Sequence, residues 1–258
     1  MKEETRQNIL NSLVSEKSLK TSLSRKTKEF IFESIPNELI PQYEANGWKI
    51  CKQYKKTVKM QKQKPLDMAF EDDVWTLFAR MGFLFLNKDR TFKLPYSDNE
   101  NLTQQVDVFV ADEETILIIE CKTAENPKQS NFKETIEAIG GKKEGLITAI
   151  QHLFPDTKYK IKFIFATKNY YLSEQDSARL DNYGIIHFDE EVLKYYQELT
   201  KHLGPSAKYQ LLGSIFEGQT IPELDNRIPA IKGKMGGYTY YSFSIEPEKL
   251  LKIGYVLH

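Results

Sequence analysis

Two apolar runs, at residues 106–111 and 115–119, flank the polar tripeptide Asp112-Glu113-Glu114 in the middle of the chain. Both runs are rich in residues that favour strands, and the polar turn between them predicts a β-hairpin. The second run is continuous rather than alternating, which is typical of a central strand buried on both faces. We therefore expect the hairpin to lie in the middle of a sheet.

The spacing of apolar residues predicts the elements around this hairpin. Apolar positions three and four residues apart predict a helix from Asp67, a candidate N-cap, to Gly82. Asn126-Pro127 is expected to separate the hairpin from the next helix. The other predicted elements are a first sheet strand at 90–94, a helix at 131–154, a strand at 160–167, a short helix capped by Ser173, a strand at 184–188 and a helix opened by Asp189. Over residues 67–203 this order predicts a mixed α/β sheet covered by helices on both faces.

The two ends of the chain differ from this core. Residues 1–66 are predicted as an N-terminal extension, with one or two helices within residues 1–34 and a basic strand over residues 48–60. Residues 204–258 are predicted as a linker and a small α+β segment, with a strand at 238–243 and a helix from Pro247. The apolar side chains after Pro247 are expected to pack into another chain or into the remainder of a longer polypeptide.

Charge changes the picture at the N-terminal end. The net charge is zero, but residues 49–64 contain seven lysines and no acid. A local basic stretch of this kind favours a polyanionic partner. The alternative is an edge strand whose lysines prevent aggregation. The candidate nucleic-acid-binding residues are Lys52, Lys55, Lys56, Lys59 and Lys143. Lys143 lies in the apolar stripe of the helix at 131–154, where its side chain either reaches the edge at which the predicted central strand ends or extends into solvent.

Several function classes are disfavoured. No run approaches eighteen apolar residues, so no membrane span is expected. The charged first residues lead into no signal segment, and two cysteines form no disulfide framework, which favours a reduced cytoplasmic setting. The phosphate-binding G-x-x-x-x-G-K-[ST] motif is absent, so no nucleoside triphosphate is expected as a partner. The four histidines are scattered singly, and zinc is not expected.

The predicted central strand ends in charged residues. Side chains alternate across a strand, so Glu120 and Lys122 share a face while Cys121 points the other way. Asp107 lies at the start of the neighbouring strand, where a twisted hairpin brings it level with Glu120. Burying two carboxylates is costly unless a divalent cation compensates them. The alternative is an ordinary ion pair between Glu120 and Lys122 at a strand end.

Asp107, a gap of twelve residues and then Glu120-Cys121-Lys122 closing an apolar strand resemble the PD-(D/E)xK nuclease superfamily. The Glu-x-Lys form is similar to the branch with Mrr-type restriction enzymes and archaeal Holliday-junction resolvases, although Val106 replaces the leading proline. The resemblance implies a restriction-endonuclease-like fold over residues 67–203. It also implies that Asp107, Glu120 and the backbone carbonyl of Cys121 bind Mg²⁺, with Mn²⁺ expected to substitute, and that Lys122 assists catalysis.

The resemblance also implies a role for Glu71, because many members carry a metal-directed acid on the first core helix. The alternative for Glu71 is an acid that complements the helix dipole, as Asp72 and Asp73 would also do. A second resemblance lies at residues 240–256, which look like the opening of the DGQHR-domain family without its eponymous motif. That family includes regulators linked to DNA phosphorothioation.

Together these resemblances imply a Mg²⁺-dependent DNA endonuclease in DNA defence or modification-linked restriction. It would act as a homo-oligomer or within a larger complex. The alternative is that the protein has the same fold but no nuclease activity, and is a catalytically silent DNA-binding or regulatory module that senses modified DNA.

Overall fold

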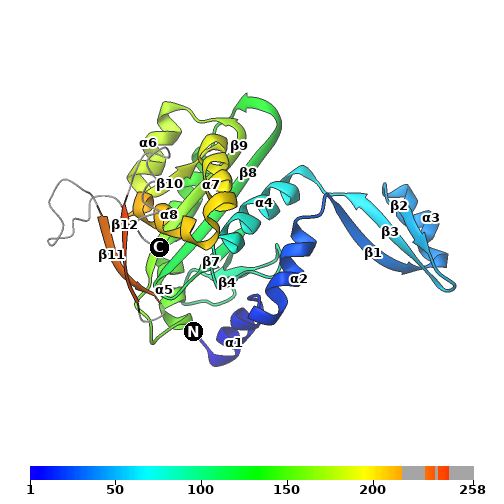
Figure 1. Cartoon of the computed structure of the whole chain (residues 1–258), viewed down its shortest axis with the longest axis horizontal. Helices are drawn as coiled ribbons and strands as arrows, with labels where there is room; N and C mark the ends of the chain where they lie inside the picture. The colour runs from blue at the N-terminus through cyan, green and yellow to red at the C-terminus, as the bar shows by residue number, and fades with distance from the viewer. Residues whose placement is uncertain (217–229, 236–237, 244–258) are drawn as a thin grey trace.

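The computed structural model describes residues 1–216, 230–235 and 238–243, and a mixed β-sheet lies at its centre (Figure 1). Strand β7 runs antiparallel to its neighbours β4 and β8, whereas β8, β9 and β10 run parallel to one another. In the described part of the chain the strand order is β10 (Ile185–Phe188), β9 (Lys160–Tyr171), β8 (Thr115–Gln129), β7 (Val108–Ala111) and β4 (Phe85–Leu86). The predicted α/β class, with a mixed sheet flanked by helices, is confirmed.

The predicted hairpin forms β7 and β8, and residues 115–119 of β8 are all buried. Leu117 and Ile119 pack on one face of the sheet, and Ile116 and Ile118 pack on the other. The expectation that the strand ends before Asn126-Pro127 is wrong, because β8 continues to Gln129. The proline is tolerated because the pairing of β8 with β9 is irregular between Thr123 and Lys128.

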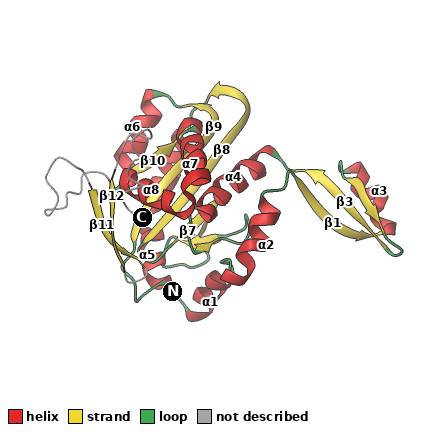
Figure 2. Cartoon of the chain, viewed as in Figure 1, coloured by secondary structure: helices red, strands yellow, loops and turns green. Residues whose placement is uncertain are grey.

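Helices cover both faces of this sheet (Figure 2). On the first face the apolar cluster includes residues of α4 (Leu66–Arg80), α7 (Glu190–Leu203) and α8 (Ala207–Ile215). On the second face it includes residues of α5 (Lys133–Leu153), α6 (Glu174–Tyr183) and α1 (Glu3–Asn11). Helix α2 (Glu16–Lys26) lies against α4. The side chains of Ser173 and Asp189 cap α6 and α7 as predicted.

The first sheet strand lies elsewhere than predicted. Residues 90–94 lead into β5 (Lys93–Pro95), which pairs with β6 (Thr103–Gln105) in a separate ribbon, and the edge of the main sheet is β4. The alternation in this stretch is real, because Phe92 and Leu94 are buried. However, they pack in the cluster beneath α5 rather than in the main sheet. A two-residue strand such as β4 is too short to leave a period-2 signal.

The C-terminal end begins with a helix rather than with the predicted linker. Helix α8 buries Ala207, Leu211, Leu212 and Ile215 in the cluster that also contains α4. Beyond it, β11 (Ala230–Met235) pairs antiparallel with β12 (Tyr238–Phe243), and β12 lies where the strand at 238–243 is predicted. The predicted helix from Pro247 and the apolar residues after it lie outside the described residues.

An inserted lobe, residues 30–63, projects from the main body between α2 and α4 (Figure 1). Its antiparallel sheet has the order β1-β3-β2, and Ile35, Val58 and Met60 are buried on one face of it. The lobe consists of β1 (Phe30–Pro36), the short 3₁₀ helix Asn37–Leu39, α3 (Ile40–Ala45), β2 (Lys49–Gln53) and β3 (Thr57–Gln63). Figure 1 shows α3 beside this sheet, away from the main body.

Two predictions about the N-terminal extension are corrected by the lobe. The helical region predicted within residues 1–34 ends earlier, because β1 begins at Phe30. The single basic strand predicted at residues 48–60 is a hairpin, because the chain reverses at Lys55-Lys56 and the backbone N–H of Tyr54 donates to the Thr57 carbonyl over 2.8 Å. The turn is formed by two lysines and contains neither the glycine nor the proline that usually marks a turn in a sequence.

Within the described ranges, no helix combines the length and the apolar character that crossing a membrane requires.

Two glycines of α5 allow a matched test of how this helix packs. A Cβ atom on Gly145 would lie 1.8 Å from the Tyr96 carbonyl oxygen, whereas one on Gly141 would meet nothing within 4 Å. We expect Gly145→Ala to destabilise the protein by about 2 kcal/mol or more, because the neighbouring backbone must move. Gly141→Ala is expected to stabilise it by about 0.5–1 kcal/mol through helix propensity. Urea denaturation of both variants measures the difference, and equal effects would contradict the close contact of α5 with Tyr96.

Candidate active site on the central hairpin

The hairpin brings Asp107 and Glu120 together, as the sequence predicts. Val108 of β7 pairs with Ile119 of β8, and one residue beyond this pair Asp107 comes level with Glu120. Asp107 also reaches across the hairpin, because its Oδ2 accepts a hydrogen bond from the backbone N–H of Cys121 over 2.9 Å. A carboxylate that accepts from a backbone N–H makes a strong, directional bond. The position of Asp107 is therefore fixed by the backbone of the central strand.

Asn87, next to strand β4, supports this arrangement from the other side. Its Nδ2 donates to the backbone carbonyl of Asp107 over 3.1 Å, and its Oδ1 accepts from the backbone N–H of Phe109 over 3.0 Å. Asn87 is buried and bridges the residues before and after Val108. Sequence reasoning did not find Asn87, because a single asparagine in a loop carries no signal of its partners.

Lys122 lies beside Glu120 on β8, as strand alternation predicts. Its Nζ donates to Glu120 Oε1 over 2.5 Å, and the side chain of Lys122 is 33% exposed whereas that of Glu120 is 18% exposed. The Cys121 thiol belongs to the apolar cluster on the α4 face. The contact between Glu120 and Lys122 has the geometry of an ion pair between neighbouring positions on one face of a strand.

Burial and mutual repulsion set the electrostatics of this group. Burial raises the pKa of Asp107, and burial together with the Asp107 charge raises the pKa of Glu120. For Lys122, burial favours the neutral amine, but the charges of Glu120 and Asp107 outweigh it and raise the pKa. Burial also raises the pKa of the Cys121 thiol well above its usual value, which makes it a poor nucleophile. Lys122 is therefore charged at neutral pH.

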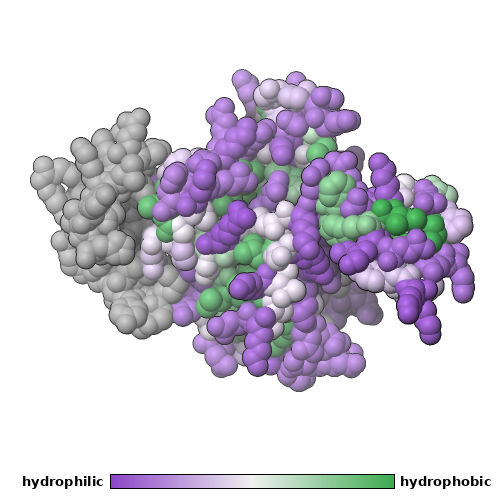
Figure 3. All heavy atoms as spheres, turned by 45° about the vertical axis from the view of Figure 1, so that its right-hand side comes forward, coloured by the Kyte–Doolittle hydropathy of each residue, from purple (hydrophilic) through white to green (hydrophobic). Residues whose placement is uncertain are grey.

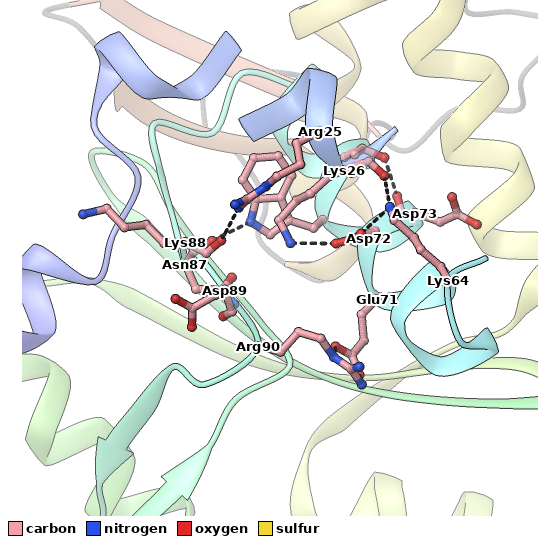
Figure 4. Close-up of polar contacts among 12 residues, drawn as sticks. Arg25, Lys26, Lys64, Glu71, Asp72, Asp73, Asn87, Lys88, Asp89 and Arg90 are labelled. Carbon is pink, nitrogen blue, oxygen red and sulfur yellow. Dashed lines mark hydrogen bonds and ion pairs between the residues drawn. The ribbon is translucent and has the colours of Figure 1, made fainter. Parts of the chain in front are cut away.

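Helix α4 places Glu71 near these groups, and Arg90 holds it there. Arg90 Nε donates to Glu71 Oε2 over 2.5 Å, and a terminal nitrogen of Arg90 donates to Glu71 Oε1 over 2.6 Å (Figure 4). The same terminal nitrogen donates to Asp67 Oδ2 over 2.6 Å. Burial raises the pKa of Glu71, Arg90 counteracts this, and the Asp107 charge adds to the rise. Sequence reasoning missed Arg90, which lies nineteen residues from Glu71.

The next acid of α4 connects to a different part of the molecule. Asp72 accepts from Lys26 Nζ over 2.7 Å and from Lys64 Nζ over 2.6 Å, and all three side chains are less than 10% exposed (Figure 4). Lys26 ends α2 and Lys64 follows β3, so this ion-pair group joins both ends of the lobe to α4. The alternative in which Asp72 complements the helix dipole is thus only part of its role.

The predicted nucleic-acid-binding lysines do not all lie together. Lys52, Lys55, Lys56 and Lys59 lie in the lobe. Lys143 instead donates to the Tyr183 carbonyl at the end of α6 over 2.5 Å, and its Nζ lies 5.4 Å from the centroid of the Phe163 ring. Burial lowers the pKa of Lys143.

The side chains suit a divalent cation only in part. Among the described residues, no three His, Cys, Asp or Glu side chains form a group that could hold a metal ion as they stand. Both oxygens of Glu71 accept from Arg90, which leaves Asp107 and Glu120 as the available carboxylates. With the Cys121 carbonyl these two provide hard oxygen donors of the kind that Mg²⁺ accepts, with water completing its six ligands. The set thus fits Mg²⁺ as a two-carboxylate site, and Glu71 could join it only if Arg90 moved.

Comparison with known proteins adds little to this geometry. No protein-family model matches the chain, and no curated protein matches it. Among solved structures, the crystal structure of protein VC1899 from Vibrio cholerae is similar with a TM-score of 0.37 and 11% identity. The alignment covers 80% of this chain and 58% of that protein.

Removal of Arg90 tests whether it neutralises the buried Glu71. We expect Arg90→Ala to destabilise the protein by about 2 kcal/mol at pH 7, because the Glu71 carboxylate would be buried without a partner. The loss should shrink as the pH falls through the raised pKa of Glu71 and the carboxyl becomes neutral. Urea denaturation between pH 4 and pH 8 measures this. Adding Glu71→Gln should restore part of the stability, and a pH-independent loss in Arg90→Ala would contradict the assignment.

A second test concerns the pair of carboxylates on the hairpin. Because the folded-state pKa values of Asp107 and Glu120 are raised, the native state binds more protons than the unfolded chain, and stability falls as the pH rises from about 4 through these pKa values. In EDTA at pH 7, Asp107→Asn should therefore be more stable than the wild type by about 1 kcal/mol, or about 2–4 °C in Tm. The gain should disappear below about pH 4. Asp156→Asn, at an exposed acid, is the control, and an equal gain there would refute the repulsion.

Proposed function

We propose that this protein is a Mg²⁺-dependent DNA endonuclease that hydrolyses phosphodiester bonds, in a setting of DNA defence or modification-linked restriction. The observation that carries the proposal is the bond from the Cys121 backbone N–H to Asp107, which sets Asp107 level with Glu120, where the Lys122 charge also acts on it. Two partly buried carboxylates and a charged lysine where the apolar run of β8 ends agree with the resemblance to the PD-(D/E)xK nucleases.

In the proposed reaction Asp107, Glu120 and the Cys121 carbonyl hold the ion. A bound Mg²⁺ would polarise a phosphoryl oxygen and lower the pKa of a bound water. Lys122 is protonated at neutral pH, because its pKa is raised. It is therefore suited to stabilise negative charge that develops on the phosphate, or to orient the attacking water, rather than to act as a general base. Its exposed fraction of 33% leaves it accessible to a substrate.

Glu71 and Arg90 have a supporting role in this proposal. The Asp107 charge raises the pKa of Glu71, and the Arg90 charge lowers that of Asp107, so the two pairs interact electrostatically. Arg90 thereby reduces the repulsion among three buried acids before any cation binds. Glu71 acts as a metal ligand only in a state in which Arg90 has turned away.

A second candidate function is a catalytically silent DNA-binding or regulatory module that senses modified DNA. The observation that favours it is that Glu120 pairs with Lys122 and Glu71 pairs with Arg90, so both acids have a cationic partner without a metal ion. A catalytically inactive protein with this fold would retain ion pairs of this kind.

Cleavage of supercoiled plasmid, unmodified and phosphorothioated, separates the two functions. With Mg²⁺ or Mn²⁺ we expect nicking or linearisation that EDTA abolishes. Asp107→Ala and Glu120→Ala should each reduce the rate at least about a hundredfold, and Lys122→Ala should reduce it about 10²–10³-fold, because each removes a group that acts on the transition state. Glu134→Gln, at an exposed acid on α5, should cleave like the wild type.

The contrary outcomes are equally clear. Wild-type rates in both Asp107→Ala and Glu120→Ala would rule out the nuclease assignment. A wild-type protein that binds either DNA but cuts neither with any metal would favour the regulatory module.

A further inference from the structure

The sheet of the lobe has one covered face and one open face. Val58 and Met60 of β3 point to the covered face, where Tyr43 of α3 and Trp48 pack against their cluster. Because side chains alternate along a strand, the neighbouring positions of β3 point the other way. One of these positions is Lys59, and cross-strand partners share a face of the sheet. The open face therefore carries Phe30 and Phe32 of β1, Lys49 and Lys52 of β2, and Lys59 of β3.

The open face is basic. Within β1, β2 and β3, its ionisable side chains in the described structure are Lys49, Lys52 and Lys59, and Glu33 lies on the covered face, where its Oε1 accepts from the Tyr43 hydroxyl. Lys52 and Lys59 are direct cross-strand partners. Like charges directly opposite each other destabilise a sheet, and a bound polyanion would relieve that cost.

An aromatic ring lies in the middle of this charge. Phe32 is 37% exposed, and the Nζ atoms of Lys59 and Lys28 lie 4.4 Å and 5.5 Å from its ring centroid. In Figure 3, which turns the lobe towards the viewer, hydrophilic and apolar side chains lie next to one another on its surface. An exposed ring among cations is the combination on which the bases of an unpaired strand stack while lysines contact its phosphates.

Protection of a sheet edge does not account for this face. Lysines that prevent aggregation lie on edge strands. Lys59 lies on β3, which is the middle strand of the lobe and pairs on both sides. Protection likewise gives no reason to leave Phe32 exposed between two lysines. Lys52, on the edge strand β2, fits either role, so Lys59 and Phe32 decide between them.

We propose that the open face of the lobe binds a single strand of nucleic acid, with phosphates on Lys49, Lys52 and Lys59 and a base stacked on Phe32. This deepens the proposed function, on which its role in catalysis rests, because the nuclease would then act on DNA that exposes an unpaired strand, as supercoiled plasmid does. A duplex would meet the same lysines through its backbone, but its paired bases would not stack on Phe32. Phe32 therefore distinguishes the two ligands.

The test measures, by fluorescence anisotropy, the binding of a labelled dT oligonucleotide and of a labelled duplex of equal length. EDTA is present so that no cleavage occurs. We expect the wild type to prefer the single strand. The double variant Lys52→Gln/Lys59→Gln should bind it about tenfold more weakly and lower the slope of log K against log salt by about 1.4, or about 0.7 for each phosphate that is no longer neutralised. Phe32→Leu should weaken single-strand binding at least about fivefold and leave duplex binding unchanged.

The control is Lys17→Gln/Lys20→Gln, which removes two exposed lysines from α2 and should bind like the wild type. Thermal denaturation checks folding, and Lys52→Gln/Lys59→Gln should be at least as stable as the wild type because a repulsive pair is removed. A preference for duplex, or a Phe32→Leu variant with unchanged single-strand affinity, would overturn the proposal. Loss of strand binding with plasmid cleavage intact would overturn this inference alone, whereas intact strand binding without cleavage would overturn only the nuclease assignment.

Discussion

The buried carboxylate of Asp72 holds the parts of this molecule in a common frame. It lies between Lys26 and Lys64, and these lysines come from the two chain segments that lead into and out of the lobe. A buried carboxylate is stable only if its charge is matched and its oxygens are hydrogen-bonded, and here each oxygen has its own lysine. Lys64 also donates to the Lys26 carbonyl, and Lys26 lies 5.0 Å from the Trp75 ring centroid. The ion-pair group therefore fixes the root of the lobe on α4.

The same helix also carries Glu71 of the candidate site, and Glu71 and Asp72 diverge because consecutive residues of a helix point about 100° apart. Glu71 turns towards Arg90, while Asp72 turns towards the lysines at the root of the lobe. The acids at the site outnumber their cations, so without a metal ion the site repels phosphate. In the proposed nuclease the attraction for nucleic acid comes instead from the lysines of the lobe, which projects from the main body next to the beginning of α4 (Figure 1).

The parts of the fold that follow from local rules could be predicted from the sequence. The continuous apolar run of β8 required burial on both faces, and the caps at Ser173 and Asp189 required only nearby backbone N–H groups. Alternation on β8 also placed Glu120 beside Lys122. The missed features depend on partners that are distant in sequence. Arg90 finds Glu71 only after the chain has folded, and Phe92 alternates as in a main-sheet strand although its neighbours belong to a separate ribbon.

The small core of the lobe makes its attachment decisive. In the described structure its buried apolar side chains are Ile35, Val58 and Met60, too few to fix the lobe against the main body by apolar packing. Its orientation depends instead on the root, where the backbone N–H of Lys64 donates to the Glu29 carbonyl over 3.1 Å and the lysines bind Asp72. A strand held on the open face of the lobe would consequently be held relative to α4, and through Glu71 relative to Asp107 and Glu120. In the proposed nuclease, different residues would then bind the strand and cleave it. Their relative position would be set by α4, because Asp72 holds the root of the lobe and its neighbour Glu71 lies at the candidate site.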